Sequence, residues 1–236
     1  MNPPPNFNRL ANLYRWMEWF SFGPMLSWSR TAFLPEAAAC RHALVLGDGD
    51  GRFTARLLAA NPDLTVDAVD ASNSMLGALI RRAGPNSIRV RTHTADARTW
   101  QPDPGNPPYD LIVTHFFLDC LTTHEVQSLA STLRAAIAPS AIWILSDFAI
   151  PSNLLGRLAA KLAVSSLYLA FACLTGLTVR TLPDHSTALR NSGFILQDRR
   201  TRLAGLLISE RWTPSPQTPP TPWNLLRNRL SIHLPQ

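Results

Sequence analysis

The feature that most constrains the fold is the alternation of short apolar runs with helical segments between residues 43 and 146. The apolar runs are bounded by Gly, Pro, Asn and Asp and predict buried strands, whereas the intervening segments have helical apolar spacing. Strands separated by helices form parallel βαβ units with right-handed crossovers and helices on both faces of the sheet. The predicted strands are Ala43–Leu46, Leu64–Val69, Ile88–His93, Tyr109–Thr114 and Ala141–Ser146.

The pattern changes after residue 146, where a long apolar helical segment covers residues 152–178. Two strands then follow one another closely enough to pair antiparallel. The expected fold class is therefore α/β, with a doubly wound, mostly parallel seven-stranded sheet, a C-terminal antiparallel hairpin and a helical cap. The remaining predicted elements are a helix ending near Ala60, helices Ser72–Ala83, Glu125–Ala138 (ended by Pro139) and Asp184–Asn191, and strands Phe194–Arg199 and Leu203–Glu210.

Three regions are expected along the chain. Residues 1–41 form an N-terminal helical cap, whose helical pattern over 7–35 breaks at Gly23-Pro24. Residues 42–211 form the main domain, with 152–190 inserted as a further cap. Residues 212–236 are rich in proline, which prevents regular structure, and are predicted to be a disordered tail.

Composition excludes several classes of function. The formal net charge is +6, but the arginines that carry it are scattered and Lys161 is the only lysine, so no nucleic-acid partner is predicted. Three widely spaced cysteines indicate a reducing compartment, with neither a disulfide framework nor a metal site. The first residues, Met1-Asn2-Pro3-Pro4-Pro5, lack the pattern of a secretory signal, and a cytoplasmic location is expected.

One stretch has a length near that of a membrane span, because no charged side chain lies between Lys161 and Arg180. It contains several Ser, Thr and Gly residues, and the strands that follow it must rejoin the sheet. We therefore expect residues 154–177 to cover the sheet edge as an apolar lid, with at most peripheral membrane contact.

The strongest local signal is Leu44-Val45-Leu46-Gly47-Asp48-Gly49-Asp50-Gly51, between a strand and a helix. Alternating glycines let the backbone approach a ligand and expose N–H groups at the helix start. The spacing differs from the dinucleotide fingerprint and from the phosphate-binding loop, so it favours a nucleoside without a pyrophosphate.

Acidic residues follow the next two predicted strands. Asp70, in Val69-Asp70-Ala71-Ser72, can accept hydrogen bonds from both ribose hydroxyls, although Asp70 or Ser72 could instead merely cap the following helix. Asp96, in Ala95-Asp96-Ala97, can accept from an exocyclic adenine amine, although alone it reads as a loop acid. Three such features in order, at the ends of successive strands, indicate a nucleoside site.

These motifs resemble those of class I S-adenosylmethionine-dependent methyltransferases over residues 42–148. The resemblance implies the Rossmann-like methyltransferase fold and S-adenosyl-L-methionine as cofactor. It departs at Val45, where many members have an acidic residue two places before the first glycine. The cofactor-binding residues it implies are Tyr14, Gly47, Asp48, Gly49, Asp50, Gly51, Asp70, Ala71, Met75, Asp96, Ala97 and His115.

The N-terminus is similar to that of menaquinone and ubiquinone C-methyltransferases, through Phe7, Ala11, Tyr14 and Met17 followed by Ser21-Phe22-Gly23. In that group the segment folds over the cofactor, which implies a contact from Tyr14. The alternative is a helix whose aromatic residues pack on the core. The group's Gly-Leu-Arg-Asn run is replaced here by Phe117-Leu118-Asp119-Cys120.

His115 and Asp119 follow the fourth strand and are the candidate catalytic residues. His115 can act as a general base, form a wall of the cofactor pocket, or be a polar residue satisfied by backbone. The tetrapeptide Asn106-Pro107-Pro108-Tyr109 matches one that N-methyltransferases use to hold an amino nitrogen. Here it precedes the strand, so it would lie at the opposite sheet edge and is interpreted as an extended surface loop.

The sequence therefore predicts a methyltransferase that acts on a small, hydrophobic acceptor: quinone-like, phenolic or lipid-like. Two alternatives remain: a cofactor-binding scaffold without activity and, less favoured, a nucleic-acid or protein N-methyltransferase. The oligomeric state, the acceptor and the methylated atom are left open.

Overall fold

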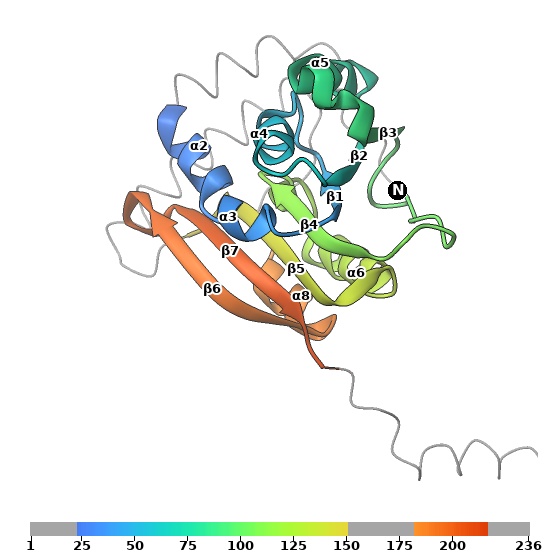
Figure 1. Cartoon of the computed structure of the whole chain (residues 1–236). Helices are drawn as coiled ribbons and strands as arrows, with labels where there is room; N and C mark the ends of the chain where they lie inside the picture. The colour runs from blue at the N-terminus through green and yellow to red at the C-terminus, as the bar shows by residue number, and fades with distance from the viewer. Residues whose placement is uncertain (1–22, 151–181, 217–236) are drawn as a thin grey trace, which may run out of the picture.

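The protein is described from a computed structural model, which places residues 23–150 and 182–216. These residues form one seven-stranded sheet with helices on both faces (Figure 1). Within these residues, no helix is both long and apolar enough to span a membrane. The predicted N-terminal helix before Gly23, with Tyr14, and the whole of the predicted lid, residues 154–177, lie outside them. The helices are α2 Gly23–Thr31, α3 Leu34–Ala37, α4 Arg52–Ala60, α5 Asn73–Ala83, α6 Thr123–Arg134 and α8 His185–Asn191, with 3₁₀ turns η2 Gly84–Arg89, η3 Leu118–Cys120 and η4 Leu203–Gly205.

The strand order confirms the predicted fold class. Five strands pair in parallel and the last two antiparallel, in the order β3-β2-β1-β4-β5-β7-β6. The chain moves outward from β1 to β3 and returns to β4, so the order reverses between β1 and β4. Crevices at such a point, at the carboxyl ends of the strands, are where open α/β sheets bind ligands. The strands are β1 His42–Leu46, β2 Thr65–Asp70, β3 Val90–Thr94, β4 Tyr109–His115, β5 Ile137–Phe148, β6 Phe194–Arg202 and β7 Leu207–Pro214.

Two hydrophobic clusters lie on opposite faces of the sheet. One joins α2–α5 to the sheet through side chains such as Phe33, Phe53 and Leu79. The other joins α6 and α8 through Leu129 and Leu189, among others. Burial of such side chains contributes roughly 1.5–3 kcal/mol each, and it fixes both layers against the sheet.

Several predicted boundaries are wrong for identifiable reasons. Pro139 does not follow a helix but lies inside β5, where the register with β4 shifts between Tyr109 and Leu111. An irregularity of this kind tolerates proline because a ladder hydrogen bond is already missing. The described part of the chain starts at Gly23, where α2 begins with Pro24 in its first turn, a position that accepts proline; the residues before the predicted break lie outside the described part.

The tail boundary at residue 212 is also wrong. Trp212 is fully buried, and β7 continues to Pro214, which pairs with Phe194. Ser215 then donates its N–H to the carbonyl of Gly193 at 2.8 Å. The sheet therefore uses the first residues of the proline-rich segment, and residues 217–236 lie outside the described part.

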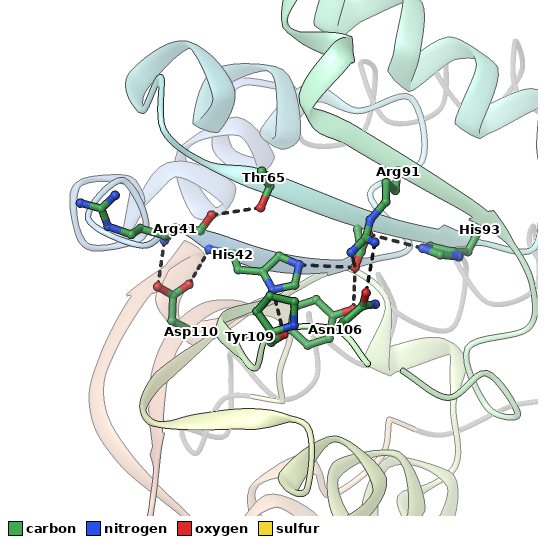
Figure 2. Close-up of polar contacts among 10 residues, drawn as sticks. Arg41, His42, Thr65, Arg91, His93, Asn106, Tyr109 and Asp110 are labelled. Atoms are coloured by element: carbon green, nitrogen blue, oxygen red, sulfur yellow. Dashed lines mark hydrogen bonds and ion pairs between the residues drawn. The ribbon is translucent and has the colours of Figure 1, made fainter. Parts of the chain in front are cut away.

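A buried carboxylate, Asp67, organises the amino edge of the sheet and the loop before β4 (Figure 2). Its oxygens accept two hydrogen bonds from the Arg91 guanidinium, at 2.7 and 2.8 Å, and one from the Tyr109 hydroxyl at 2.6 Å. Arg91 also donates to the side chain of Asn106 at 3.1 Å. Asn106 and Tyr109 thus serve this amino-edge network, which confirms that the tetrapeptide lies away from the carboxyl edge.

We predict that Asp67→Asn lowers the free energy of unfolding at pH 7 by about 2–4 kcal/mol, because Arg91 and the buried Tyr109 hydroxyl lose a charged acceptor. Hydrogen bonds from its neighbours hold the pKa of Asp67 below its usual value despite burial. The stability that Asp67 contributes is therefore present above its unfolded pKa, near 4, and is lost at lower pH.

Urea unfolding at pH 7 and at pH 3 measures this effect. The difference in the free energy of unfolding between wild type and Asp67→Asn should be smaller at pH 3 than at pH 7. The exposed loop residue Asp103 provides a matched control, and Asp103→Asn should change stability by less than about 0.5 kcal/mol. Equal effects of the two substitutions would contradict the role of Asp67.

Candidate functional site

The glycine-rich turn between β1 and α4 forms the centre of the candidate site. Gly47, Gly49 and Gly51 all have positive φ, at 66°, 58° and 77°. A Cβ at Gly51 would lie 2.6 Å from Cγ of Leu79 and 2.7 Å from its Cα, so α5 closes on the turn only because glycine is there. A Cβ at Gly49 would meet only the sulfur of Met75, at 3.9 Å, so this glycine leaves room for a ligand.

Asp48 links this turn to α4. Its Oδ2 accepts hydrogen bonds from the backbone N–H and the hydroxyl of Thr54, at 2.8 and 2.7 Å. It therefore caps α4 from outside the helix, because Gly51 at the N-cap has no side chain to do so. Oδ1 of Asp48 is buried and has no hydrogen-bond partner among the described residues. Burial raises the pKa of Asp48.

Asp70 ends β2 beside the turn. Its Oδ1 accepts the N–H of Ser72 at 2.8 Å, whereas the hydroxyl of Ser72 accepts the N–H of Met75 at the start of α5. The helix is therefore capped by Ser72, which bears out the capping alternative for that residue, whereas Asp70 is not the N-cap of α5. Burial, with a smaller repulsion from Asp48, raises the pKa of Asp70 to about 6. A half-buried carboxylate with a raised pKa is suited to accept hydrogen bonds from a ligand.

Two other predicted cofactor contacts are engaged by arginines. Asp50 pairs with Arg82 at 2.6 Å and with Arg52 at 3.2 Å. Asp96 pairs with Arg98 at 2.6 Å, which holds its pKa below the usual value. A carboxylate has about four lone-pair positions, so each acid can still accept a further bond. Their roles toward a cofactor stay predictions.

Ala71, Met75 and Ala97, also predicted to bind the cofactor, lie at the carboxyl edge of the sheet. Met75 and Ala97 are buried, whereas Ala71, the residue after β2, is exposed. Ala97 packs in the cluster that contains Val69, and Met75 approaches the glycine turn. Tyr14 lies outside the described residues.

His115 ends β4 on the face covered by α4. It is 3% exposed, its ring meets that of Phe53 edge-on at 4.5 Å, and neither ring nitrogen has a hydrogen-bond partner among the described residues. Burial and then the nearby Arg30 hold the pKa of His115 well below its usual value. The reading of His115 as a residue satisfied by backbone is therefore wrong.

The residue after His115 has strained backbone. Phe116 has φ of 53°, which is unfavourable for a bulky side chain and is typical of functional sites. Its ring lies 5.3 Å from that of Phe148 between centroids, and the Arg30 guanidinium carbon lies 5.1 Å from the Phe116 centroid. Aromatic surface from the ends of β4 and β5 therefore gathers at the carboxyl edge.

Asp119 lies in η3 against Asp147, the next-to-last residue of β5. Oδ2 of Asp147 accepts the N–H of Asp119 at 3.1 Å, and the thiol of Cys120 donates to Asp119 at 3.5 Å. The two acids are 9% and 2% exposed. Burial raises the pKa of both, and their mutual repulsion raises that of Asp147 further. The pair is therefore suited to hold a proton at neutral pH.

The structure thus brings the glycine turn, Asp70, His115 and Asp119 to one edge of the sheet, and adds residues that the sequence analysis missed. Asp147 follows the apolar part of β5 as Asp70 follows that of β2, so the same signal could have identified it. Arg30 and Thr54 carry no such local signal. Within the described ranges, no cluster of three His, Cys, Asp or Glu residues is arranged to hold a metal ion.

This combination of strand order, glycine turn and strand-end acids defines a protein class. Residues 44–142 match the methyltransferase domain family. This match covers less than half of the chain and agrees with the resemblance to S-adenosylmethionine-dependent methyltransferases found in the sequence.

Particular proteins are similar over part or most of the chain. Trans-aconitate 2-methyltransferase from Paracidovorax citrulli (strain AAC00-1) is 34% identical over 105 residues, which cover 44% of this chain and 38% of that protein. The enzyme of the same name from Delftia acidovorans (strain DSM 14801 / SPH-1) is 33% identical over 44% of this chain and 37% of its own. The matched region thus spans less than two-fifths of the length of either relative.

Solved structures share the fold over a larger span. The S-adenosylmethionine-dependent methyltransferase SibL, in its apo form, has a TM-score of 0.65 and 21% identity, covering 91% of this chain and 63% of its own. The DhpI–SAH complex has a TM-score of 0.62 and 17% identity, covering 89% and 94%.

We predict that Asp70→Ala weakens binding of S-adenosylhomocysteine by about 10- to 100-fold, because ribose hydroxyls lose charge-assisted bonds worth roughly 1.5–3 kcal/mol. Because the pKa of Asp70 is raised to about 6, its ionised form is lost as pH falls through that value. Wild-type affinity should therefore fall by up to about tenfold per pH unit below pH 6.

Calorimetric titration from pH 5 to pH 8 measures both effects. Asp70→Asn should remove most of the pH dependence. Asp63 is exposed just before β2, so Asp63→Ala is a matched control that should leave affinity unchanged. An unchanged dissociation constant in folded Asp70→Ala would remove the ribose assignment.

Proposed function

We propose that this protein transfers the methyl group of S-adenosylmethionine to a small-molecule acceptor. The observation that carries the proposal is the half-buried Asp70 carboxylate beside the glycine turn, at the point where the strand order reverses. A carboxylate there can accept both ribose hydroxyls, while Gly49 lets the backbone approach the ligand.

The residues present fit this cofactor. The buried Oδ1 of Asp48 and the ring nitrogens of His115 are polar groups that the described residues leave without hydrogen bonds. Buried groups of this kind are costly unless a ligand or water satisfies them. When bound, S-adenosylmethionine would supply a sulfonium methyl group, which the lone pair of the acceptor would attack in line while the methyl–sulfur bond breaks and S-adenosylhomocysteine leaves. The chain's own residues bind, orient and exclude water, which can supply much of the acceleration.

A proton must leave an acceptor that carries one on the methylated atom. The carboxyl pair of Asp119 and Asp147 suits this step better than His115 does, because a raised carboxyl pKa lies nearer to neutral pH. The lowered pKa of His115 makes it a weak base. We assign Asp119 as the proton acceptor and His115 as a wall of the cofactor pocket.

A hydrophobic acceptor with a ring is favoured by the Phe116 and Phe148 side chains near Asp119. The predicted lid, residues 154–177, would add apolar surface from outside the described residues. Trans-aconitate, named in two relatives, is a second candidate, favoured by their 34% and 33% identity. A small polycarboxylic acid would meet the acidic pair unfavourably, so we place it second. Cytoplasmic location with at most peripheral membrane contact remains a prediction.

The direct test is titration with S-adenosylhomocysteine, followed by transfer of labelled methyl from S-adenosylmethionine to phenols, quinols, lipid extracts and trans-aconitate. Binding with turnover on a ring-containing acceptor is expected. Turnover on trans-aconitate alone would overturn the assignment of a hydrophobic acceptor, but would support methyl transfer as the reaction. Binding without turnover on any acceptor would favour the inactive scaffold.

We further predict that Asp119→Asn lowers kcat by about 10²- to 10⁴-fold, the range typical of general-base catalysis, with little change in cofactor affinity. The measurement is steady-state turnover with the acceptor identified above, beside calorimetry with S-adenosylhomocysteine. Asp103→Asn, which removes an exposed acid, serves as control. Unchanged kcat in Asp119→Asn would show that Asp119 is not the base.

A further inference from the structure

The last residues of β5 hold neighbouring segments of the chain at the carboxyl edge. The hydroxyl of Ser146 donates to the carbonyl of Ser29 on α2 at 2.8 Å, and its own carbonyl accepts the N–H of Phe116 at 2.7 Å. Because side chains alternate along a strand, Asp147 faces the opposite side of the sheet, which α6 and α8 cover. The end of β5 therefore connects both faces of the sheet beside the candidate base, Asp119.

Both carboxylate oxygens of Asp147 accept hydrogen bonds from backbone N–H groups. Oδ2 accepts the N–H of Asp119 in η3 at 3.1 Å, and Oδ1 accepts the N–H of Phe148 at 2.9 Å. The second bond joins adjacent residues, so it fixes the carboxylate on its own strand. The first bond joins residues that are 28 positions apart in the chain. The carboxylate of Asp147 therefore determines where η3, and with it Asp119, lies against β5.

Three buried acids gather at the end of β5 and the facing part of β7. Asp119 and Asp147 are joined by Glu210 on β7, whose charge adds to the repulsion at Asp147. Glu210 is paired with His185 at 3.2 Å and with Arg199 at 2.5 Å. Although burial acts against ionisation, these two partners hold the pKa of Glu210 below its usual value. Glu210 therefore stays charged, and Asp147 has negative charge on two sides.

Two neighbouring buried carboxylates are costly to ionise together, because like charges repel strongly where water does not screen them. Burial raises the pKa of Asp119 to about 6. Burial, and then repulsion from Asp119, hold the pKa of Asp147 well above its usual value. The thiol of Cys120, which donates to Asp119, also stays protonated because burial raises its pKa. Near neutral pH, Asp119 is therefore the charged member of the pair, and Asp147 keeps a proton.

We infer that Asp147 is a positioning residue for the proposed reaction: it fixes the backbone of Asp119 and carries the one proton that the two carboxyl groups hold between them. Asp119 is thereby left charged when the acceptor arrives. In the methyl transfer described above, the proton leaves the methylated atom of the acceptor, forms the O–H bond of Asp119, and passes to water before the next turnover. This inference rests on the proposed function and adds the residue that keeps its base in place and ionised.

NMR of protein with isotope-labelled aspartate carboxyl carbons measures these ionisations without any ligand. Wild type should show two linked steps for the pair, the lower one near pH 6. Asp147→Asn should remove the higher step. Asp119→Asn should move the step of Asp147 down by at least about one pH unit, because the repulsion from the first charge is gone. Two independent steps, or two ionised carboxylates at pH 7, would overturn the inference.

The positioning role also predicts a graded effect on turnover of a phenol or quinol in the labelled-methyl assay. Asp147→Leu removes the acceptor of the Asp119 N–H and should lower kcat by about 10- to 100-fold, because a small displacement of a reacting group has an effect of this size. Affinity for S-adenosylhomocysteine should change by less than about threefold. Asp147→Asn keeps an oxygen for that hydrogen bond, so it should restore most of the loss and leave the acid limb of the kcat profile near pH 6. Equal losses in the two variants, or an unchanged kcat in Asp147→Leu, would contradict the positioning role.

Asp110 offers a matched control at the opposite edge of the sheet. Its carboxylate accepts the backbone N–H groups of Arg41 and His42, at 2.8 and 2.9 Å. Asp110→Leu should lower the melting temperature but leave kcat within about twofold. If wild type does not bind S-adenosylhomocysteine, the proposed function fails, and Asp147 has no reaction to serve. Binding of S-adenosylhomocysteine together with two independent carboxyl steps would overturn this inference alone.

Discussion

The site depends on the close approach of the glycine turn to its neighbours. At Gly51 the chain turns with φ of 77°, and α5 packs so closely that a side chain there would overlap Leu79. At Gly47 the ring of Phe117 fills the space where a Cβ would be. The turn thereby brings three parts of the chain together: the end of β1, the start of α5 and the segment after β4. Any residue other than glycine at these positions would push the strand ends apart and open the site.

Local patterns were sufficient for the parts of this arrangement that lie close together in the sequence. The parallel strands, the turn and Asp70 could be predicted because apolar runs, glycine spacing and an acid at a strand end are all local. The course of β5 through Pro139 could not, because it depends on a register shift against Tyr109 and Leu111 in another strand. The same is true of the burial of Trp212, which depends on pairing with β5 and β6.

The contacts that place the missed residues Arg30 and Asp147 at the site are non-local as well, although Asp147 itself follows an apolar strand and could have been identified from that. Arg30 reaches the glycine turn only because Ser146 and Ser209 hold α2 across the sheet, and these partners are more than a hundred residues away in the chain. Asp147 becomes part of the site through a hydrogen bond from the backbone of Asp119 in the preceding βα segment. Nothing in the sequence around either residue indicates these partners.

The acids at the two edges of the sheet have pKa values shifted in opposite directions. This contrast distinguishes an acid that stabilises the fold from acids that are suited to bind a ligand. At the amino edge, Asp67 is surrounded by donors from Arg91, Tyr109 and the neighbouring histidines, and its pKa is lowered (Figure 2). At the carboxyl edge, Asp48 and Asp70 have few donors, and burial raises their pKa values. An acid that already has all its partners contributes stability but has little left for a ligand. Acids that are buried and only partly satisfied cost stability in the free protein, and a ligand that brings donors recovers that cost on binding. The carboxyl edge is therefore the edge of this sheet that is suited to bind the proposed cofactor.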